Sequence, residues 1–384
     1  MKGLIVTAEW NPKPGYTVSD FEKTTGKAIT GNSIWKNPRL ELKEVPDPTP
    51  GPKDVVLKVR ACGVCGSDVH FYETDSDGYM LYPGLTKFPC VIGHEFSGEV
   101  VAAGKEVKDL KIGDMVTAEE MIWCGECIPC RNGYPNQCLN LEEIGFTING
   151  AFAEYIVIGA KYCWKIDEIA SRYGDKEKGF EAGALVEPTS VAYNGMFVRA
   201  GGFKPGGYVV VFGAGPIGLA SIALAKASGA SKIMAFEVSA KRRELAKLVG
   251  AEYVYNPVEI NPADVIMDVT KGFGADLFVE AAGAPTKTIP EMEKTLAIGG
   301  KIVQIGRAAE RVPVYLEYFQ THAAQIFGAQ GHSGYGTFQN AIRLMASGRI
   351  DMTQIVTSKF SLDEAVKAIE KTTHREDGKV MVKM

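Results

Sequence analysis

Hydrophobic and polar positions alternate over short distances in the first half of the chain. Apolar side chains occupy every second position in residues 54–61, which is the pattern of a half-buried β-strand. Similar runs occur at 96–101 and 153–158, and Gly- and Pro-rich turns separate them. Short strands divided by turn residues predict a small β-rich domain of the barrel type.

Strands and helices alternate from residue 208 onward. Residues 208–212 form an unbroken apolar run, as expected for a parallel strand buried on both faces. Residues 219–228 have a helical composition. Further strands are predicted at 232–236, 275–280 and 301–305, and a further helix at 240–249. This alternation predicts an α/β domain with a doubly wound parallel sheet, a fold that binds nucleotides.

Length, composition and charge narrow the functional classes. The chain has 384 residues, of which 46% are hydrophobic, enough for two domains with proper cores. Its 42 basic and 46 acidic side chains give a net charge of −4, and no basic run marks a nucleic-acid surface. No apolar stretch reaches about 18 residues, and the N-terminal apolar run is too short for a signal peptide. We expect a soluble, cytoplasmic protein with a small-molecule partner, without nucleic-acid or membrane binding.

Four of the eight cysteines lie within fifteen residues, with the spacing C-x2-C-x2-C-x7-C. Thiolates from one tight loop and a short excursion can close a tetrahedron around zinc and leave no position for a substrate. Without an export signal, metal binding is favoured over disulfide bonding. The pattern predicts a structural zinc site formed by Cys124, Cys127, Cys130 and Cys138.

A second set of possible metal ligands lies earlier in the chain. Cys65 offers a thiolate, His94 an imidazole and Glu95 a carboxylate, and zinc accepts all three donor types. A thiol or an imidazole on its own is often only a core residue. Their joint occurrence predicts a reactive metal centre.

A glycine-rich loop follows the apolar strand at 208–212. Gly213, Gly215 and Gly218 form the pattern G-x-G-x-x-G, with Ile217 directly before the last glycine. The first glycine permits a tight turn, the second lets the backbone approach a pyrophosphate, and the third lets helix and strand pack closely. The helix N-terminus then faces the phosphates. We therefore expect a bound dinucleotide.

Glu237 follows the second strand of this unit, about 20 residues beyond the glycine-rich loop. Its carboxylate can accept hydrogen bonds from a free ribose hydroxyl and would repel a 2′-phosphate. NAD is therefore favoured over NADP. Lys241 and Arg243 leave NADP as an open alternative.

The run Gly63-Val64-Cys65-Gly66-Ser67-Asp68, followed by Gly93-His94-Glu95, resembles the catalytic-zinc signature of the zinc-containing medium-chain dehydrogenases. This family includes alcohol, sorbitol and threonine dehydrogenases, and the resemblance covers nearly the whole chain from Leu40. The cysteine cluster is similar to the structural-zinc lobe of the family. The resemblance implies a GroES-like catalytic domain, a Rossmann domain, and a homo-oligomer, either a homodimer or a homotetramer.

The resemblance also implies how the chain is divided. Residues 1–188 would form the catalytic domain, with the zinc lobe at about 120–140. Residues 189–325 would form the NAD-binding domain, and residues 326–384 would return to the catalytic domain. The family passes residues 11–37 in a few positions, so this segment is an insertion. Its composition fits a solvated surface loop, or alternatively a flap or a subunit contact.

The metal ligands implied by the resemblance extend the reactive centre. Cys65 and His94 would hold the catalytic zinc, and Glu187 stands at the remaining ligand position. Glu95 would either bind the same zinc or support the site from behind its ligands.

The resemblance assigns further roles around this centre. Ser67 and His70 stand where the family relays a proton from the substrate to solvent, against the simpler alternative of a buried serine and an exposed histidine. On the cofactor side, the implied contact residues are Arg242 beside the adenosine ribose, and Ile305, Gly306 and Gln330 near the nicotinamide.

Zinc and NAD together imply oxidation of an alcohol to a ketone by hydride transfer. The Glu187-Pro188 pair is similar to the polyol branch of the family, whereas Phe71 replaces a tyrosine of the sorbitol dehydrogenases. With the insertion and the Tyr79–Tyr82 loop, the chain resembles the scyllo-inosose dehydrogenases of inositol catabolism. Alternatives are a sorbitol or L-threonine dehydrogenase, and a protein that binds the nucleotide without catalysis.

Overall fold

The computed structural model describes residues 1–308 and 310–384, which form two compact units. Unit 1 consists of Met1–Glu187, Ser358–His374 and Val380–Met384, and unit 2 of Pro188–Thr357 and Arg375–Lys379. The chain thus returns to unit 1 at Ser358, later than the expected position 326. One reason is that strand β16 (Gln325–Gly328) pairs in parallel with β15 (Leu296–Gln304) and extends the sheet of unit 2. A second reason is that the turn Met352–Ile355 contacts the helices at 216–227 and 240–249 of the same unit.

Unit 1 is rich in β-structure. Its strands are β1 (Lys2–Trp10), β2 (Trp35–Glu44), β3 (Asp54–Gly63), β4 (Cys90–Val91), β5 (Glu95–Ala103), β6 (Met115–Ala118), β7 (Met121–Ile122), β8 (Glu142–Glu143), β9 (Tyr155–Gly159), β10 (Cys163–Lys165), β17 (Val356–Ser361) and β18 (Lys379–Lys383). The largest sheet has the order β10-β6-β5-β3-β18-β17, and β9 also pairs with β3. The strands predicted at 54–61, 96–101 and 153–158 are confirmed as β3, β5 and β9.

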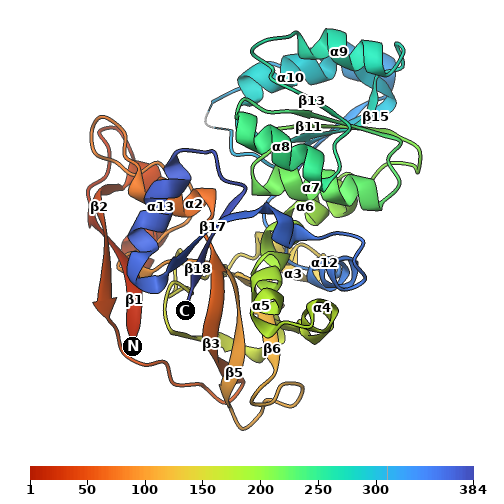
Figure 1. The fold of residues 1–384 in the computed structure, drawn as a ribbon. Helices are drawn as coiled ribbons and strands as arrows, with labels where there is room; N and C mark the ends of the chain where they lie inside the picture. The colour runs from red at the N-terminus through yellow and green to blue at the C-terminus, as the bar shows by residue number, and fades with distance from the viewer. Residues whose placement is uncertain (309) are drawn as a thin grey trace. The chain divides into compact units, whose positions relative to one another are not determined.

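Short helices surround these sheets. They are α1 (Asp20–Thr25), α2 (Gly66–Tyr72), α3 (Ile128–Arg131), α4 (Asp167–Tyr173), α5 (Lys176–Ala184) and α13 (Ala365–Thr373). Helix α13 comes from the C-terminal part of the chain and lies beside α2 (Figure 1). Residues from both ends of the sequence therefore build unit 1.

The insertion at 11–37 is an ordered part of unit 1. Ala28 and Ile34 are fully buried and Trp35 is nearly so, whereas Phe21 and Ile29 are exposed, so the segment lies at the surface but is anchored to unit 1 by its second half. The segment contains α1, whose N-terminus is capped by Ser19 and Glu22. Its burial depends on contacts within unit 1.

Unit 2 contains a six-stranded parallel sheet of order β13-β12-β11-β14-β15-β16. Besides β15 and β16, its strands are β11 (Tyr208–Phe212), β12 (Lys232–Phe236), β13 (Tyr253–Tyr255) and β14 (Ala275–Glu280). The predicted doubly wound α/β fold is therefore confirmed. The order reverses at β11, so the chain after β11 lies at the switch point where this fold binds ligands.

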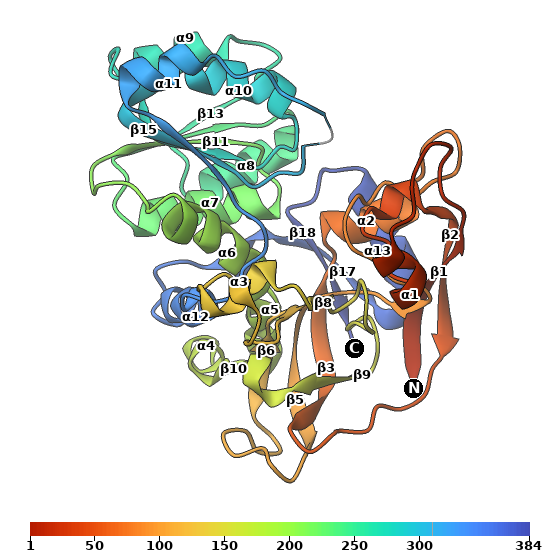
Figure 2. The same ribbon diagram turned by 180° about the vertical axis from the view of Figure 1, so that it is seen from behind.

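Helices cover both faces of this sheet, as Figures 1 and 2 show for α9 and α10 on one face and α7 and α8 on the other. The helices are α6 (Val186–Tyr193), α7 (Pro216–Ala227), α8 (Ala240–Val249), α9 (Pro262–Val269), α10 (Pro285–Glu293), α11 (Leu316–His322) and α12 (Thr337–Ala346). Burial on both faces explains the apolar strand sequences, and Phe212 stacks on Phe236 at 4.8 Å within this core. Among the described residues, the helices are too short or too polar to cross a bilayer.

Candidate active site

Strand pairing brings three possible metal ligands together in unit 1. Strand β3 pairs antiparallel with β5 so that Gly63 lies opposite Glu95. Cys65 follows two residues after Gly63, and His94 directly precedes Glu95. The sulfur, nitrogen and oxygen ligand atoms of Cys65, His94 and Glu95 therefore lie within 4.8 Å of one another. Donors of these three types suit zinc.

Asp68 organises this cluster, although the sequence analysis did not assign it a role. Cys65 is the N-cap of α2, and the Asp68 carboxylate accepts a hydrogen bond of 2.9 Å from the Cys65 backbone N–H. The other carboxylate oxygen of this fully buried residue lies 3.9 Å from Nδ1 of His94. An acidic residue three positions after a helix N-cap is the sequence signal that could have revealed it.

The electrostatics of His94 favour a bound cation. Burial by itself would lower the pKa of this imidazole. The groups around the ring outweigh burial and raise the pKa well above its usual range; in order of size they are Asp68, Cys65 and Glu187. A metal ion competes with the proton for such a ring, so an anionic S, N and O donor set fits a divalent metal.

Glu187 lies in the first turn of α6 and is buried. Its charge acts on the His94 ring, but the close ligand set contains Glu95. One of its carboxylate oxygens lies within 4.8 Å of the carboxylate of Glu120, another buried acid. Glu120 was missed in the sequence analysis, where only its position just before the cysteine cluster could have drawn attention to it.

The two residues expected to relay a proton lie about one turn apart on α2, at positions i and i+3. Ser67 Oγ is 3.5 Å from Nε2 of His94, next to the ligand set. His70 occupies the last turn of the helix and is partly exposed. Phe71, in contrast, is fully buried and packs edge-on against Tyr82 and Phe146.

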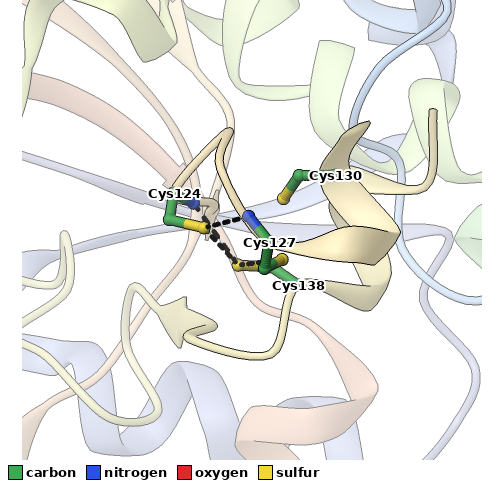
Figure 3. Close-up of side chains that lie close together, drawn as sticks. All are labelled: Cys124, Cys127, Cys130 and Cys138. Carbon is green, nitrogen blue, oxygen red and sulfur yellow. Dashed lines mark hydrogen bonds between the residues drawn. The ribbon is translucent and has the colours of Figure 1, made fainter. Parts of the chain in front are cut away.

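The four clustered cysteines form a separate lobe of unit 1. Their sulfur atoms lie within 4.8 Å of one another, and Figure 3 shows the four side chains converging. Cys127 caps the N-terminus of α3, which carries Cys130, while Gly125 takes a positive φ of +86° in the turn before them. The turn and the short helix thus aim three thiols from one local segment, and Cys138 completes the set.

The thiols of this lobe differ in acidity. The backbone N–H groups of Glu126 and Cys127 donate to Cys124 Sγ, each at 3.4 Å, and lower the pKa of this thiol to about 6. Burial raises the pKa of Cys130 to about 12. Four sulfurs this close can all be thiolates only when a cation compensates their charge, and four thiolates match a closed structural zinc site.

The glycine-rich loop of unit 2 has the local geometry expected for a pyrophosphate. Gly213 has a φ of +89°, and a Cβ on it would lie 2.7 Å from the Ala282 backbone. A Cβ on Gly218 would overlap the carbonyl oxygen of Gly213, so helix and strand need glycine there. Gly215 caps α7, and Ile217 is partly exposed in its first turn.

Glu237 is held across this loop. Its carboxylate accepts hydrogen bonds from the Ala214 N–H at 2.6 Å and the Ser239 N–H at 2.8 Å. Arg242 lies beside it, where burial lowers the pKa of the guanidinium and the charge of Glu237 opposes that shift. The Nε–H of Arg242 donates to the backbone carbonyl of Asp377 at 2.9 Å.

The neighbouring basic side chains have other partners. Lys241 pairs with Glu376 at 2.6 Å. Arg243 donates to the carbonyl oxygens of Glu237 and Val238 at 3.0 and 2.8 Å. Lys241 and Arg243, which had left NADP as an alternative cofactor, therefore both have protein partners in this structure.

Two of the three residues expected near the nicotinamide contact a buried acid at the end of β14. The Ile305 and Gly306 N–H groups donate to the backbone carbonyl of Glu280 at 3.0 and 2.9 Å. The Glu280 side chain accepts from Gln304 Nε2 at 2.9 Å. Gln330 is tied to Asn194 through its carbonyl oxygen, at 3.4 Å. Glu280 was missed in the sequence analysis because nothing in its local sequence distinguishes it.

Two family models match the chain, the alcohol dehydrogenase GroES-like domain over residues 51–168 and the zinc-binding dehydrogenase domain over residues 216–347. The chain is 45% identical to scyllo-inosose 3-dehydrogenase of Thermotoga maritima over 382 residues, which covers 97% of this chain and 96% of that protein. It is 37% identical to L-threonine 3-dehydrogenase of Pyrococcus horikoshii over 343 residues, or 89% and 94% of the two chains.

Solved structures give the same relationship. A candidate alcohol dehydrogenase of Thermotoga maritima has a TM-score of 0.96 at 44% identity, with 100% of both chains covered. A candidate zinc-binding dehydrogenase of Sinorhizobium meliloti, bound to NADP, has a TM-score of 0.78 at 29% identity and covers 93% of this chain and 99% of that chain.

Replacing Cys127 tests the structural site. Cys127→Ser removes one thiolate from the four-sulfur cluster and should reduce bound zinc by about one ion per chain and the melting temperature by about 5 °C or more. Metal analysis and calorimetry measure both, and Cys65→Ser serves as a control that loses zinc at the other site. A melting profile and a zinc content like those of the unmodified protein would exclude a structural metal at this lobe.

Proposed function

Because the chain belongs to the zinc-binding dehydrogenases that carry a GroES-like alcohol dehydrogenase domain, we propose that it oxidises a secondary alcohol of a polyol or cyclitol to the ketone with zinc and NAD. The preferred substrate is scyllo-inosose. The observation that carries this proposal is the S, N and O ligand set of Cys65, His94 and Glu95, with the Ser67 hydroxyl next to it.

Cys65 and His94 would hold the catalytic zinc, with Glu187 or Glu95 completing its ligands. When bound, zinc supplies a Lewis acid that lowers the pKa of a coordinated hydroxyl. The Asp68 carboxylate, 3.9 Å from His94 Nδ1, would favour the tautomer with its proton on Nδ1, and its hydrogen bond from the Cys65 N–H would keep Cys65 at the helix N-terminus. Residues that contact a metal ligand from behind in this way keep the ligand correctly oriented.

Ser67 would accept the substrate proton. Its hydroxyl lies beside Nε2 of the His94 ring, at the first turn of α2. His70 lies in the last turn of the same helix, is partly exposed, and would release the proton to solvent. The proton would thus leave along α2 while the hydride goes to the cofactor.

The nucleotide would bind at the glycine-rich loop of unit 2. Its pyrophosphate would face Gly215 and the N-terminus of α7, and its adenosine ribose would face Glu237 and Arg242. Ile305, Gly306 and Gln330 would line the nicotinamide half, which supplies the hydride acceptor. Because the carboxylate of Glu237 disfavours a 2′-phosphate, NAD is preferred to NADP.

The relative from Thermotoga maritima supports a cyclitol as the substrate, since it shares 45% of its residues with this chain over almost its entire length. Threonine and sorbitol remain the alternative substrates, and the threonine dehydrogenases are more distant at 37% identity or less among those compared. A protein without catalytic function is disfavoured, because Cys65, His94 and Ser67 are all present.

A substrate panel tests the function. We expect the zinc-loaded protein to form NADH from scyllo-inosose with a kcat/KM at least about tenfold above that for sorbitol, L-threonine and simple alcohols. Cys65→Ser should reduce this turnover by about 1,000-fold or more while NAD still binds, because only the metal centre is lost. Full activity of Cys65→Ser would refute the metal centre, and bound NAD without turnover of any substrate would indicate a non-catalytic protein.

The cofactor preference depends on Glu237. Removing its carboxylate in Glu237→Ala should weaken NAD binding by about tenfold and change NADP binding much less, because the ribose loses its acceptor and the 2′-phosphate loses a repelling charge. Fluorescence titration with NADH and NADPH measures both dissociation constants. An unchanged ratio of the two constants would rule out the ribose contact.

We also propose a cytoplasmic homodimer or homotetramer. Clustered cysteines that bind metal and form no disulfides are typical of a reducing compartment, and cell fractionation can test this location. Strand β16 is at the edge of the parallel sheet and leaves Ile326 47% exposed, a surface suited to a second copy. Light scattering should give two or four chains, and Ile326→Lys should shift the mass toward the monomer. A monomeric unmodified protein would contradict the assembly.

A further inference from the structure

A buried carboxylate, that of Glu22, stabilises the insertion at 11–37 through hydrogen bonds within the segment. Glu22 accepts hydrogen bonds from the Tyr16 hydroxyl at 2.8 Å, the Ser19 N–H at 2.8 Å and the Ile29 N–H at 2.9 Å. These three donors come from both sides of α1, so they close the segment on itself. A buried acid with this many donors needs no outside partner to be stable.

The insertion pairs with the 74–86 loop through its backbone. Ala28 and Thr86 exchange two hydrogen bonds, at 2.8 and 3.0 Å. Gly31 donates to the carbonyl of Gly84 at 3.0 Å, where a side chain on Gly31 would collide with Thr86. The loop therefore has a backbone partner along one side.

Side chains strengthen this contact. The Lys13 ammonium pairs with Asp75 at 2.7 Å and also lies over the Tyr79 ring, 4.6 Å from its centre. Trp35 donates from Nε1 to Thr86 Oγ1 at 3.1 Å. One cation and one indole of the insertion thus hold two ends of the 74–86 loop.

The same loop contacts the proposed relay helix. Leu81 donates its N–H to the carbonyl of His70 at 3.0 Å, and Tyr82 packs against Phe71 with ring centres 5.2 Å apart. Any displacement of the loop would therefore move the end of α2 that carries His70.

An aromatic path continues from the loop to a metal ligand. The ring of Tyr82 is 5.2 Å from that of Phe146, and Phe146 is 4.8 Å from the His94 ring. Lys27 of the insertion also forms an ion pair with Glu142, at the base of the turn that carries Phe146. The insertion therefore contacts both segments that pack around His94.

We propose that residues 11–37 are a positioning element of the active site. They fix the 74–86 loop and the Phe146 turn, and through these they fix the His94 ring and the His70 end of α2. The element rests on the proposed function, because it sets how tightly the polyol or cyclitol is held at the metal centre.

Lysine variants of the insertion test this proposal. Lys13→Met removes the ion pair and the contact with the Tyr79 ring, and should raise KM for scyllo-inosose about 3- to 10-fold with a smaller change in kcat. Lys13→Arg keeps a cation and should restore KM to within about twofold. Lys23→Met, an exposed position of α1, is the matched control and should leave KM unchanged.

A measurement on the metal complements the kinetics. Trp35→Phe keeps the aromatic packing but loses the hydrogen bond to Thr86, and should speed the release of one zinc ion per chain to a chelator by about tenfold. NADH affinity should stay unchanged in all variants, because the glycine-rich loop belongs to unit 2.

The outcomes separate this inference from the function itself. An unchanged KM in Lys13→Met together with unchanged zinc release in Trp35→Phe would show that the insertion at most stabilises the fold, whatever happens to the melting temperature, and would overturn the proposal. If the unmodified protein does not use scyllo-inosose, the proposed function fails. The zinc-release comparison then still decides whether the insertion positions His94.

Discussion

The antiparallel register of β3 and β5 is the constraint on which the candidate active site depends. Because Gly63 lies opposite Glu95, the chain leaving β3 and the chain entering β5 meet at the same sheet end. Cys65 and His94 are then neighbours although they are 29 positions apart in the sequence. A shift of the strand register by one residue would change which side chains face each other at this sheet end. The metal ligands are therefore held by backbone pairing and do not rely on loop contacts alone.

Charge explains why the two cysteine-containing sites need cations. In the four-cysteine lobe, backbone N–H donors stabilise the thiolate of Cys124 and lower its pKa to about 6. Burial disfavours the thiolate of Cys130 and raises its pKa to about 12. Around His94, anionic neighbours raise the pKa of the ring. In both sites, several groups that can become anionic lie close together. Either bound protons or a divalent metal ion can neutralise their mutual repulsion.

The nucleotide loop of unit 2 and the four-cysteine lobe of unit 1 were predictable for the same reason. The glycines of the loop and the cysteines of the lobe each act within a few residues of one another, so short motifs contain their geometry. Asp68 also acts locally and could have been found from its position after the N-cap. Glu120 and Glu280 could not, because their roles depend on neighbours that the fold brings from distant segments.

The amino-acid sequence by itself determined the alternation of strands and helices, the α/β class of the nucleotide-binding unit, and the candidate residues for the metal and phosphate sites. Tertiary structure decided that β16 extends the parallel sheet and that residues 352–355 pack on α7 and α8, so that the chain returns to unit 1 only at Ser358. It also decided that the polar segment 11–37 is packed and contacts the loops near His94. Local motifs can be predicted from sequence because they depend on backbone conformation and on donors a few residues away. Strand order and burial cannot, because they depend on partners far along the chain.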